Sequence, residues 1–370
     1  MLIGNISDLH YGKDQAQSYI WTEPPYEGHN SRLVWTDIAC RKALDIMVER
    51  GVDFAICEGD SAHPKGKIDI VVEGFLSRFV HMAIEKIPNW VKVVGNHGAG
   101  ELAGEHIAKS VWVQKGISVI STPTEIRLDK QQQGLRLCVL PYQGDSDKIA
   151  DALKRFRASH KKGDRTILVM HDGIKGGVVG TDEGYRLEDG FDGEGGLFDF
   201  AEFVLAGHYH RHQVFEAGGA PCCYIGSPLQ RDFGDWGTER GLVLFDTKKM
   251  HVEFVPVTEV PRFFQFKLTS TDDLKELPDL SQHYAWFRLM SETVDVERVK
   301  EIATLAPAQI TYDFEAIETE TRLAISAGST LEQMIPSYVD FASGQDVEPE
   351  LIERRKAAGV DYVRRSGVRL

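Results

Sequence analysis

The stretch FVLAGHYH, residues 203–210, decides the fold prediction because it joins a short apolar run to a polar motif. Phe203–Ala206 has the length and apolar character of a buried strand. Gly207 follows, and alternation along the chain then projects His208 and His210 to the same side. A buried strand that ends in two imidazoles predicts a ligand-binding edge of a sheet.

The same arrangement of an apolar strand followed by polar side chains recurs four more times. Open α/β sheets place their sites just beyond the carboxyl ends of their strands, so we expect these motifs to converge. The four segments are Leu2–Ser7 followed by Asp8 and His10, Asp53–Cys57 followed by Asp60 and His63, Val91–Val94 followed by Asn96 and His97, and Thr166–Met170 followed by His171.

Helical patterns alternate with these strands, which predicts an α/β layered domain. Gly173–Gly196 is rich in glycine and acidic residues and predicts a long loop near the site. Apolar spacing predicts helices at Trp35–Arg50, Ile70–Lys86 and Asp147–Ser159, and further strands at Ile117–Ser121, Leu135–Leu140, Cys222–Ile225 and Gly241–Asp246.

The chain changes character after Val255, where three residues, Pro256, Thr258 and Pro261, predict a linker. We therefore predict a main domain over 1–255, a small α+β capping domain over 256–322 and a C-terminal helical segment over 323–370. The capping domain is expected as Arg262–Leu268 strand, Asp272–Leu277 helix, His283–Met290 strand, Val294–Leu305 helix and Gln309–Phe314 strand, and the last segment as amphipathic helices Thr330–Ala342 and Glu348–Arg365.

Composition restricts the setting in which the protein works. With 370 residues and a net charge of −14, the chain argues against coating nucleic acid by bulk electrostatics, while a local basic groove or bridging cations stay open. Five cysteines without a CxxC pair favour a reduced, cytoplasmic compartment. We expect neither a membrane span nor room for a cleavable signal before Asp8.

Each motif is weak evidence alone, because a lone histidine after a strand is more often structural than a ligand. Five strand ends carrying D-x-H, G-D, G-N-H, H and G-H-x-H in this order are hard to explain by chance. Mixed imidazole, carboxylate and amide donors suit Mn²⁺, Fe or Zn²⁺ better than Mg²⁺ or Ca²⁺.

The ordered set of motifs resembles the calcineurin-like metallophosphoesterase superfamily. That resemblance, which covers about residues 1–250, implies a β-sandwich flanked by helices and two divalent metal ions. It implies one ion held by Asp8, His10, Asp60 and His210, and a second held by Asp60, Asn96, His171 and His208, with Asp60 shared.

Three further features resemble SbcD-type DNA-repair exonucleases: His63, three residues after Asp60; the segment Tyr224–Pro228 followed by Phe233–Asp235; and the C-terminal modules. The likeness implies Mn²⁺, a DNA substrate, 3′-to-5′ exonuclease and single-strand endonuclease activity, and an SbcC-like ABC ATPase partner. A homodimer is a further candidate assembly. On this basis we interpret His97 as the general acid for the leaving oxygen and His63 as orienting the phosphate or assisting that transfer.

Two departures from the family pattern keep alternatives open. Gly98 stands where the family usually has an acidic residue after the G-N-H histidine, and Glu101 or Glu105 is a candidate substitute. The aromatic insertion Asp14–Asn30 could stack on a base or form an ordinary loop. A small-molecule phosphodiesterase, a protein phosphatase and a non-catalytic scaffold that recruits a partner are therefore alternative hypotheses.

Overall fold

A computed structural model of the chain describes most of its residues as two compact units, which are treated separately. One unit comprises Met1–Leu289 and Thr293–Thr311, and the other comprises Met290–Glu292 and Tyr312–Leu370. The described residues are 1–13, 18–63, 68–97, 111–128, 134–180, 184–188, 190–193, 195–304, 307–313, 331–343 and 348–366.

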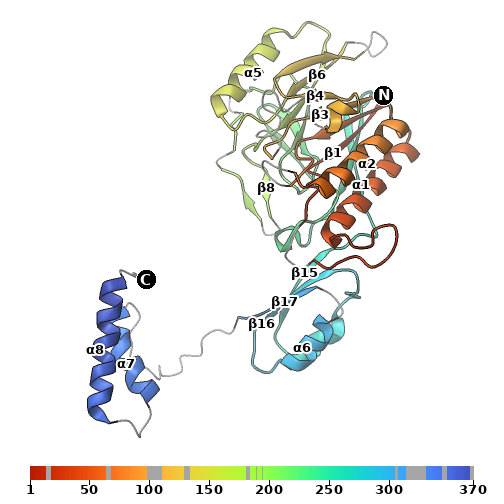
Figure 1. The fold of residues 1–370 in the computed structure, drawn as a ribbon. Coiled ribbons are helices and arrows are strands. Elements are labelled where there is room, and N and C mark those ends of the chain that lie inside the picture. Colours follow the sequence, from red (N-terminus) through yellow and green to blue (C-terminus); the bar gives the residue numbers. More distant parts are fainter. Residues whose placement is uncertain are drawn as a thin grey trace. The chain divides into compact units, whose positions relative to one another are not determined.

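Two six-stranded sheets form the two-sheet body of the first unit, residues 1–256 (Figure 1). In the first sheet, β1 to β4 are mutually parallel and β13 returns antiparallel beside β1. Its order is β14 (His251–Pro256), β13 (Gly241–Asp246), β1 (Leu2–Ser7), β2 (Phe54–Glu58), β3 (Trp90–Val93) and β4 (Ser118–Ile120).

The second sheet also has a parallel centre, but here both edge strands are antiparallel to their neighbours. Antiparallel edge strands on a largely parallel sheet are common in α/β folds. Its order is β11 (Gln213–Ala217), β12 (Ala220–Tyr224), β10 (Phe203–Gly207), β7 (Arg165–His171), β6 (Leu135–Leu140) and β5 (Thr124–Arg127).

The sheets pack face to face, and helices cover their outer faces. Ile3 of β1 lies in the apolar layer between the sheets, whereas Ile6 of the same strand contacts the helices. Burial on both faces is why these strands read as continuous apolar runs. Helices α1 (Ser31–Glu49) and α2 (Ile70–Lys86) cover the first sheet together with the short α4 (Val111–Gln114), and α5 (Ser146–Ala158) covers the second (Figure 1). The predicted α/β sandwich flanked by helices is confirmed.

Several boundaries differ from the sequence prediction. Helix α1 begins at Ser31 instead of Trp35, because Asn30 accepts hydrogen bonds from the backbone N–H groups of Arg32 and Leu33 at 3.0 and 3.3 Å. The buried Arg32 interrupted the apolar pattern that would have marked this first turn.

The prediction also missed short or half-exposed strands. The stretch predicted as a loop contains β8 (Val178–Val179) and β9 (Tyr185–Arg186), and the predicted linker begins inside β14, where Pro256 pairs with Gly241. Edge strands β5, β11 and β14 are interrupted by charged or polar residues, so they lack the apolar run that revealed the central strands.

A three-stranded module follows the two-sheet body. It contains β15 (Phe263–Leu268), the 3₁₀ helix η4 (Thr271–Glu276), β16 (Tyr284–Leu289), α6 (Val296–Ala303) and β17 (Ala308–Tyr312). The elements occur in the predicted order, with β16 central in the sheet. The 322/323 boundary and the end of the predicted strand at Phe314 lie outside the described residues.

Arg32 anchors this module to the body. Its guanidinium group lies 4.9 Å from the ring centroids of both Phe263 and Tyr284, and its Nη2 donates to the carbonyl oxygens of Gln230 and Arg231 at 3.2 and 2.7 Å. Only 1% of Arg32 is exposed, so water does not compete for these contacts.

Arg32→Ala is therefore expected to lower the free energy of unfolding by about 3 kcal/mol, through lost charged hydrogen bonds and lost ring contacts. Urea denaturation would measure the loss. The control is Arg50→Ala, which removes an exposed ion pair with Glu253 and should leave stability close to wild type. Equal stability of Arg32→Ala and wild type would contradict the anchoring role.

In the second unit, helices α7 (Leu331–Ser343) and α8 (Pro349–Ser366) lie against each other. Lys356 Nζ of α8 pairs with Asp340 Oδ1 of α7 at 2.6 Å. Gly359 leaves room for Ile335, since a Cβ at residue 359 would lie 2.7 Å from Ile335 Cγ2. Among the described helices, none is long and apolar enough to cross a membrane.

Candidate metal centre

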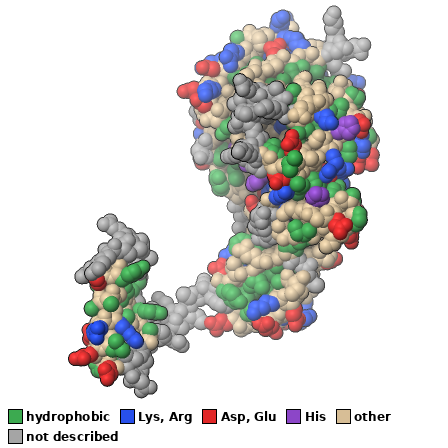
Figure 2. All heavy atoms as spheres, viewed as in Figure 1, with side chains coloured by type: hydrophobic (Ala, Val, Ile, Leu, Met, Phe, Trp, Pro, Cys, Tyr) green, Lys and Arg blue, Asp and Glu red, His purple; other side chains and the backbone are tan. Residues whose placement is uncertain are grey.

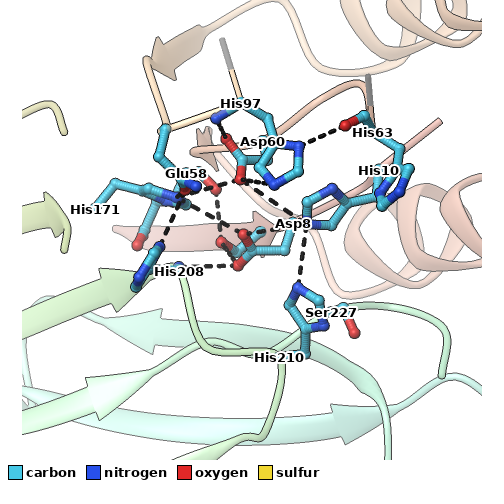
Figure 3. A network of polar contacts seen from close by, with 12 residues as sticks. Asp8, His10, Glu58, Asp60, His63, His97, His171, His208, His210 and Ser227 are labelled. Atoms are coloured by element: carbon cyan, nitrogen blue, oxygen red, sulfur yellow. Dashed lines mark hydrogen bonds and ion pairs between the residues drawn. The ribbon is translucent and has the colours of Figure 1, made fainter. Parts of the chain in front are cut away.

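The five sequence motifs meet at one edge of the sandwich (Figure 3). Strands β1, β2 and β3 deliver their motifs from the first sheet, and β7 and β10 deliver theirs from the second. The structure brings together all nine predicted site residues: Asp8, His10, Asp60, His63, Asn96, His97, His171, His208 and His210.

The backbone at this edge adopts conformations that L residues rarely take. Asp8, His10 and His208 have φ angles of 51°, 48° and 95°. Such strain persists only where the surroundings impose it, and it is concentrated at functional sites. Here the backbone N–H groups of His10 and Tyr11 donate to the carbonyl oxygens of Asp60 and Ser61 at 3.1 and 2.9 Å, which ties the first motif to the second.

One group of donors surrounds His10. Its Nε2 lies 3.1 Å from His210 Nε2 and 3.9 Å from both Asp8 Oδ1 and Asp60 Oδ2. Burial lowers the pKa of His210 to about 4, with Arg240 and Arg231 acting in the same direction against Asp8. Burial also holds the pKa of His10 well below its usual range, and electrostatic repulsion by His210 is the next largest cause. Both rings are thus neutral, the form that binds metal.

A second group surrounds Asn96. Its Oδ1 lies 3.2 Å from His171 Nε2 and 3.0 Å from His208 Nδ1. The same His171 nitrogen lies 3.8 Å from Asp8 Oδ1 and 3.7 Å from Asp60 Oδ2. Burial opposes a charge on His171, yet Asp8 and Asp60 outweigh it and raise the pKa of that imidazole. The four residues assigned to a second ion therefore lie together.

Asp60 lies between the two groups. Its Oδ2 is within 3.9 Å of Nε2 atoms of His10, His171 and His97, while its Oδ1 accepts the backbone N–H of His97 at 2.8 Å. Burial opposes ionisation of this carboxyl, but His171 and His10 overcome it and lower its pKa. An ionised carboxylate between two sets of imidazoles has the place that a bridging ligand requires.

An unpartnered carboxylate oxygen is a further indication that these residues could bind divalent cations. Asp8 Oδ1 is buried and has no hydrogen-bond partner among the described residues, although it faces two imidazoles. An unsatisfied buried carboxylate oxygen is costly unless a cation completes it. Three overlapping sets have donor atoms within 4.8 Å of one another, namely Asp8, His10 and His210; Asp8, Asp60 and His171; and His10, His63 and His97.

His97 is oriented by the main chain of His63. Its Nδ1 donates to the His63 carbonyl oxygen at 2.5 Å, and its Nε2 lies 3.9 Å from Asp60 Oδ2. A main-chain acceptor thus supplies an orienting contact of the kind expected from an acidic neighbour. Gly98, Glu101 and Glu105 lie outside the described residues.

Sequence reasoning missed two buried residues beneath the predicted ligands. Ser7 Oγ lies 2.6 Å from Asp8 Oδ2, and the Glu58 carboxyl is fully buried without a hydrogen-bond partner among the described residues. Burial, then the charge of Asp8, raises the pKa of Glu58 well above its usual range. Ser7 and Glu58 are the last residues of their strands, on the face that points into the sandwich. Sequence alternation indicates this direction but not their contact with the predicted ligands.

A cavity of about 270 Å³ opens beside the imidazoles of the last motif. It extends beneath β8, and both basic and acidic side chains line it. Its lining residues are Val178, Val179, Gly180, His208, Tyr209, His210, Arg211, Asp232, Gly234 and Asp235.

No protein-family model and no curated protein matches the chain. Solved structures with a similar fold include a dimetal phosphatase from Danio rerio, with 12% identity, 66% of this chain and 91% of that chain covered, and a TM-score of 0.42. An archaeal phosphodiesterase is 14% identical, with 69% of this chain and 99% of that chain covered and a TM-score of 0.34. The phosphoesterase Yfce from E. coli is 11% identical, with 70% of this chain and 100% of that chain covered and a TM-score of 0.32.

Proposed function

We propose that this chain is a two-metal phosphodiester hydrolase that acts on DNA as an exonuclease and single-strand endonuclease, together with an SbcC-like ABC ATPase. The observation that supports the hydrolase assignment is the position of the Asp60 carboxylate between two groups of imidazoles. The DNA substrate is supported by the motif resemblance, above all by His63 beside His97, whose ring centroids lie 5.5 Å apart.

Asp8, His10, Asp60 and His210 would hold one cation, and Asp60, Asn96, His171 and His208 the other; Mn²⁺ is our first choice, with Fe or Zn²⁺ as alternatives. Two such cations would supply Lewis-acid stabilisation of the phosphate and lower the pKa of a bound water. The protein positions these donors by its strand ends and excludes solvent, since Asp8, His10 and His171 are almost fully buried.

His97 would move the proton. Because its Nδ1 donates to the carbonyl oxygen of His63, Nε2 is the nitrogen left to face the centre. In the protonated ring, Nε2 would deliver its proton to the leaving 3′ oxygen. The exposed His63 ring lies next to His97 and would orient the phosphate or assist this transfer.

His97→Ala is expected to lower kcat on a 3′-labelled DNA duplex with Mn²⁺ by roughly 10²- to 10⁴-fold, the usual contribution of a general acid. On bis-p-nitrophenyl phosphate the loss should be much smaller, because that leaving group departs without a proton. Metal content should stay at two ions per chain. The matched control is His81→Ala, which removes an exposed histidine of α2.

Equal losses on both substrates would contradict the acid role of His97. A wild-type protein that cleaves the small diester but leaves every DNA substrate intact, even with the ATPase present, would contradict the proposed nuclease activity.

A small-molecule phosphodiesterase or protein phosphatase is the second candidate. The cavity beside the metal centre favours it, because the exposed Asp232 lines this space and would repel a polyanion. Over the face shown in Figure 2, basic and acidic side chains of the described residues are intermixed. The two-substrate assay above separates the candidates.

A further inference from the structure

The outer nitrogen of His210 faces a second carboxylate, that of Asp235. While Nε2 of His210 points toward His10, its Nδ1 lies 4.0 Å from Asp235 Oδ2. Asp235 belongs to the 3₁₀ helix η3 (Phe233–Asp235), which follows the last metal-type motif along the chain. The resemblance matched this residue only as part of a sequence segment and gave it no role.

The Asp235 carboxylate is held on both oxygens. Oδ1 lies 2.7 Å from Nη2 of Arg240, and Oδ2 accepts the backbone N–H of Arg231 at 2.7 Å. The Arg240 side chain is only 3% exposed, and none of its guanidinium nitrogens makes a hydrogen bond among the described residues, so its contact with Asp235 is an ion pair. An ion pair with a buried guanidinium holds that carboxylate in place.

We propose that Asp235 is the positioning residue for His210: it accepts the Nδ1–H of the ring and so presents Nε2 as the unprotonated donor to a cation. Carboxylate–histidine–metal arrangements of this kind select the tautomer and raise ligand basicity. Closure of the gap by about 1 Å would bring the two atoms to hydrogen-bond distance. The inference rests on the proposed metal-dependent function.

The same contacts link the three-stranded module to the metal centre. Phe233, at the start of η3, packs on Phe263 with ring centroids 4.9 Å apart, and its carbonyl oxygen accepts from Gln265 Nε2 at 2.6 Å. Gln230 Oε1 accepts the backbone N–H of Phe263 at 2.6 Å, and Gln230 Nε2 donates to the Asp235 carbonyl oxygen at 3.0 Å. Seating of the module thus determines where Asp235 lies.

The test measures Mn²⁺ affinity of the full chain by competition with a chelator, together with bound metal per chain. Asp235→Ala should lower the affinity for one of the two Mn²⁺ ions by about 100-fold, and Asp235→Asn should lower it by about 10-fold. This is the range found for residues that hydrogen-bond to metal-ligating histidines. The other ion should bind as in wild type. Asp246→Asn removes a carboxylate that accepts backbone N–H groups at the end of β13, and should change neither affinity.

Asp235→Asn keeps an oxygen for the N–H of Arg231, so a loss in this variant with an unchanged urea midpoint supports positioning over folding. Selective imidazole ¹⁵N spectra of the metal-free protein should show His210 as the Nδ1–H tautomer in wild type and as a mixture in Asp235→Ala. Unchanged affinities in both variants would overturn the role of Asp235 alone. A wild type that binds no divalent ion would overturn the proposed function as well.

Discussion

Replacement of Asp60 by asparagine is expected to lower kcat/KM for phosphodiester hydrolysis at least about 10³-fold, equivalent to about 4 kcal/mol of transition-state stabilisation. The reason is that a single oxygen of Asp60, Oδ2, lies within 3.9 Å of His10 in one group of donors and of His171 in the other, so its charge would serve both ions. Bound Mn²⁺ should fall from two ions per chain to one or none. Steady-state kinetics and elemental analysis would measure both effects.

The fold should survive this change. The asparagine oxygen can still accept the backbone N–H of His97, so the contact between the second and third motifs is kept. Circular dichroism and urea denaturation would verify this. Asp151→Asn, on the exposed face of α5, is the matched control and should retain full activity. An active Asp60→Asn variant with two bound ions would refute the two-metal assignment.

Gly59→Ala is expected to produce the largest combined loss of stability and metal binding outside the ligands themselves. Gly59 has a φ of +83°, and a Cβ at this residue would lie 1.7 Å from His171 Nδ1. The change therefore adds a collision with His171 to backbone strain. We expect about 3 kcal/mol or more of lost unfolding free energy, together with displacement of His171 and weaker Mn²⁺ binding.

Gly116→Ala separates these two causes. Gly116 has the same φ of +83°, but no atom of the described residues lies within 4 Å of a Cβ placed there. It should lose only about 1 kcal/mol from backbone strain and leave metal binding intact. Urea denaturation and chelator competition on both variants give the comparison. Similar losses for the two alanine variants would show that the approach of His171 to Gly59 is not limiting.

The central strands and the motifs that follow them were predictable because neighbouring residues in the sequence carry the signal. Leu2–Ser7, Leu135–Leu140 and Gly241–Asp246 match the predicted bounds, since strands buried on both faces read as mainly apolar runs. The start of α1 was predicted four residues late because its first turn is buried beneath the three-stranded module, where Arg32 rather than an apolar residue fills the space. Burial there depends on a partner from residues 263–284.

The candidate site divides in the same way. The residue types, their order and their position after strands were readable from the sequence, because each motif is contiguous with the strand that carries it. The contacts among them were not, since they join distant residues: the backbone N–H of His208 donates to Asp8 Oδ2 at 3.1 Å across 200 positions. No local periodicity specifies such a pair.

By itself, the sequence determined the layered α/β fold and the set of donors that could hold divalent cations. Only the tertiary structure placed Asp60 between two groups of imidazoles, gave His97 the carbonyl oxygen of His63 as its partner, and set Asp235 behind His210. The physical reason is that strand pattern is a property of neighbouring residues, whereas tautomer, charge and ligand geometry depend on which distant side chains the packed sheets bring within hydrogen-bond reach.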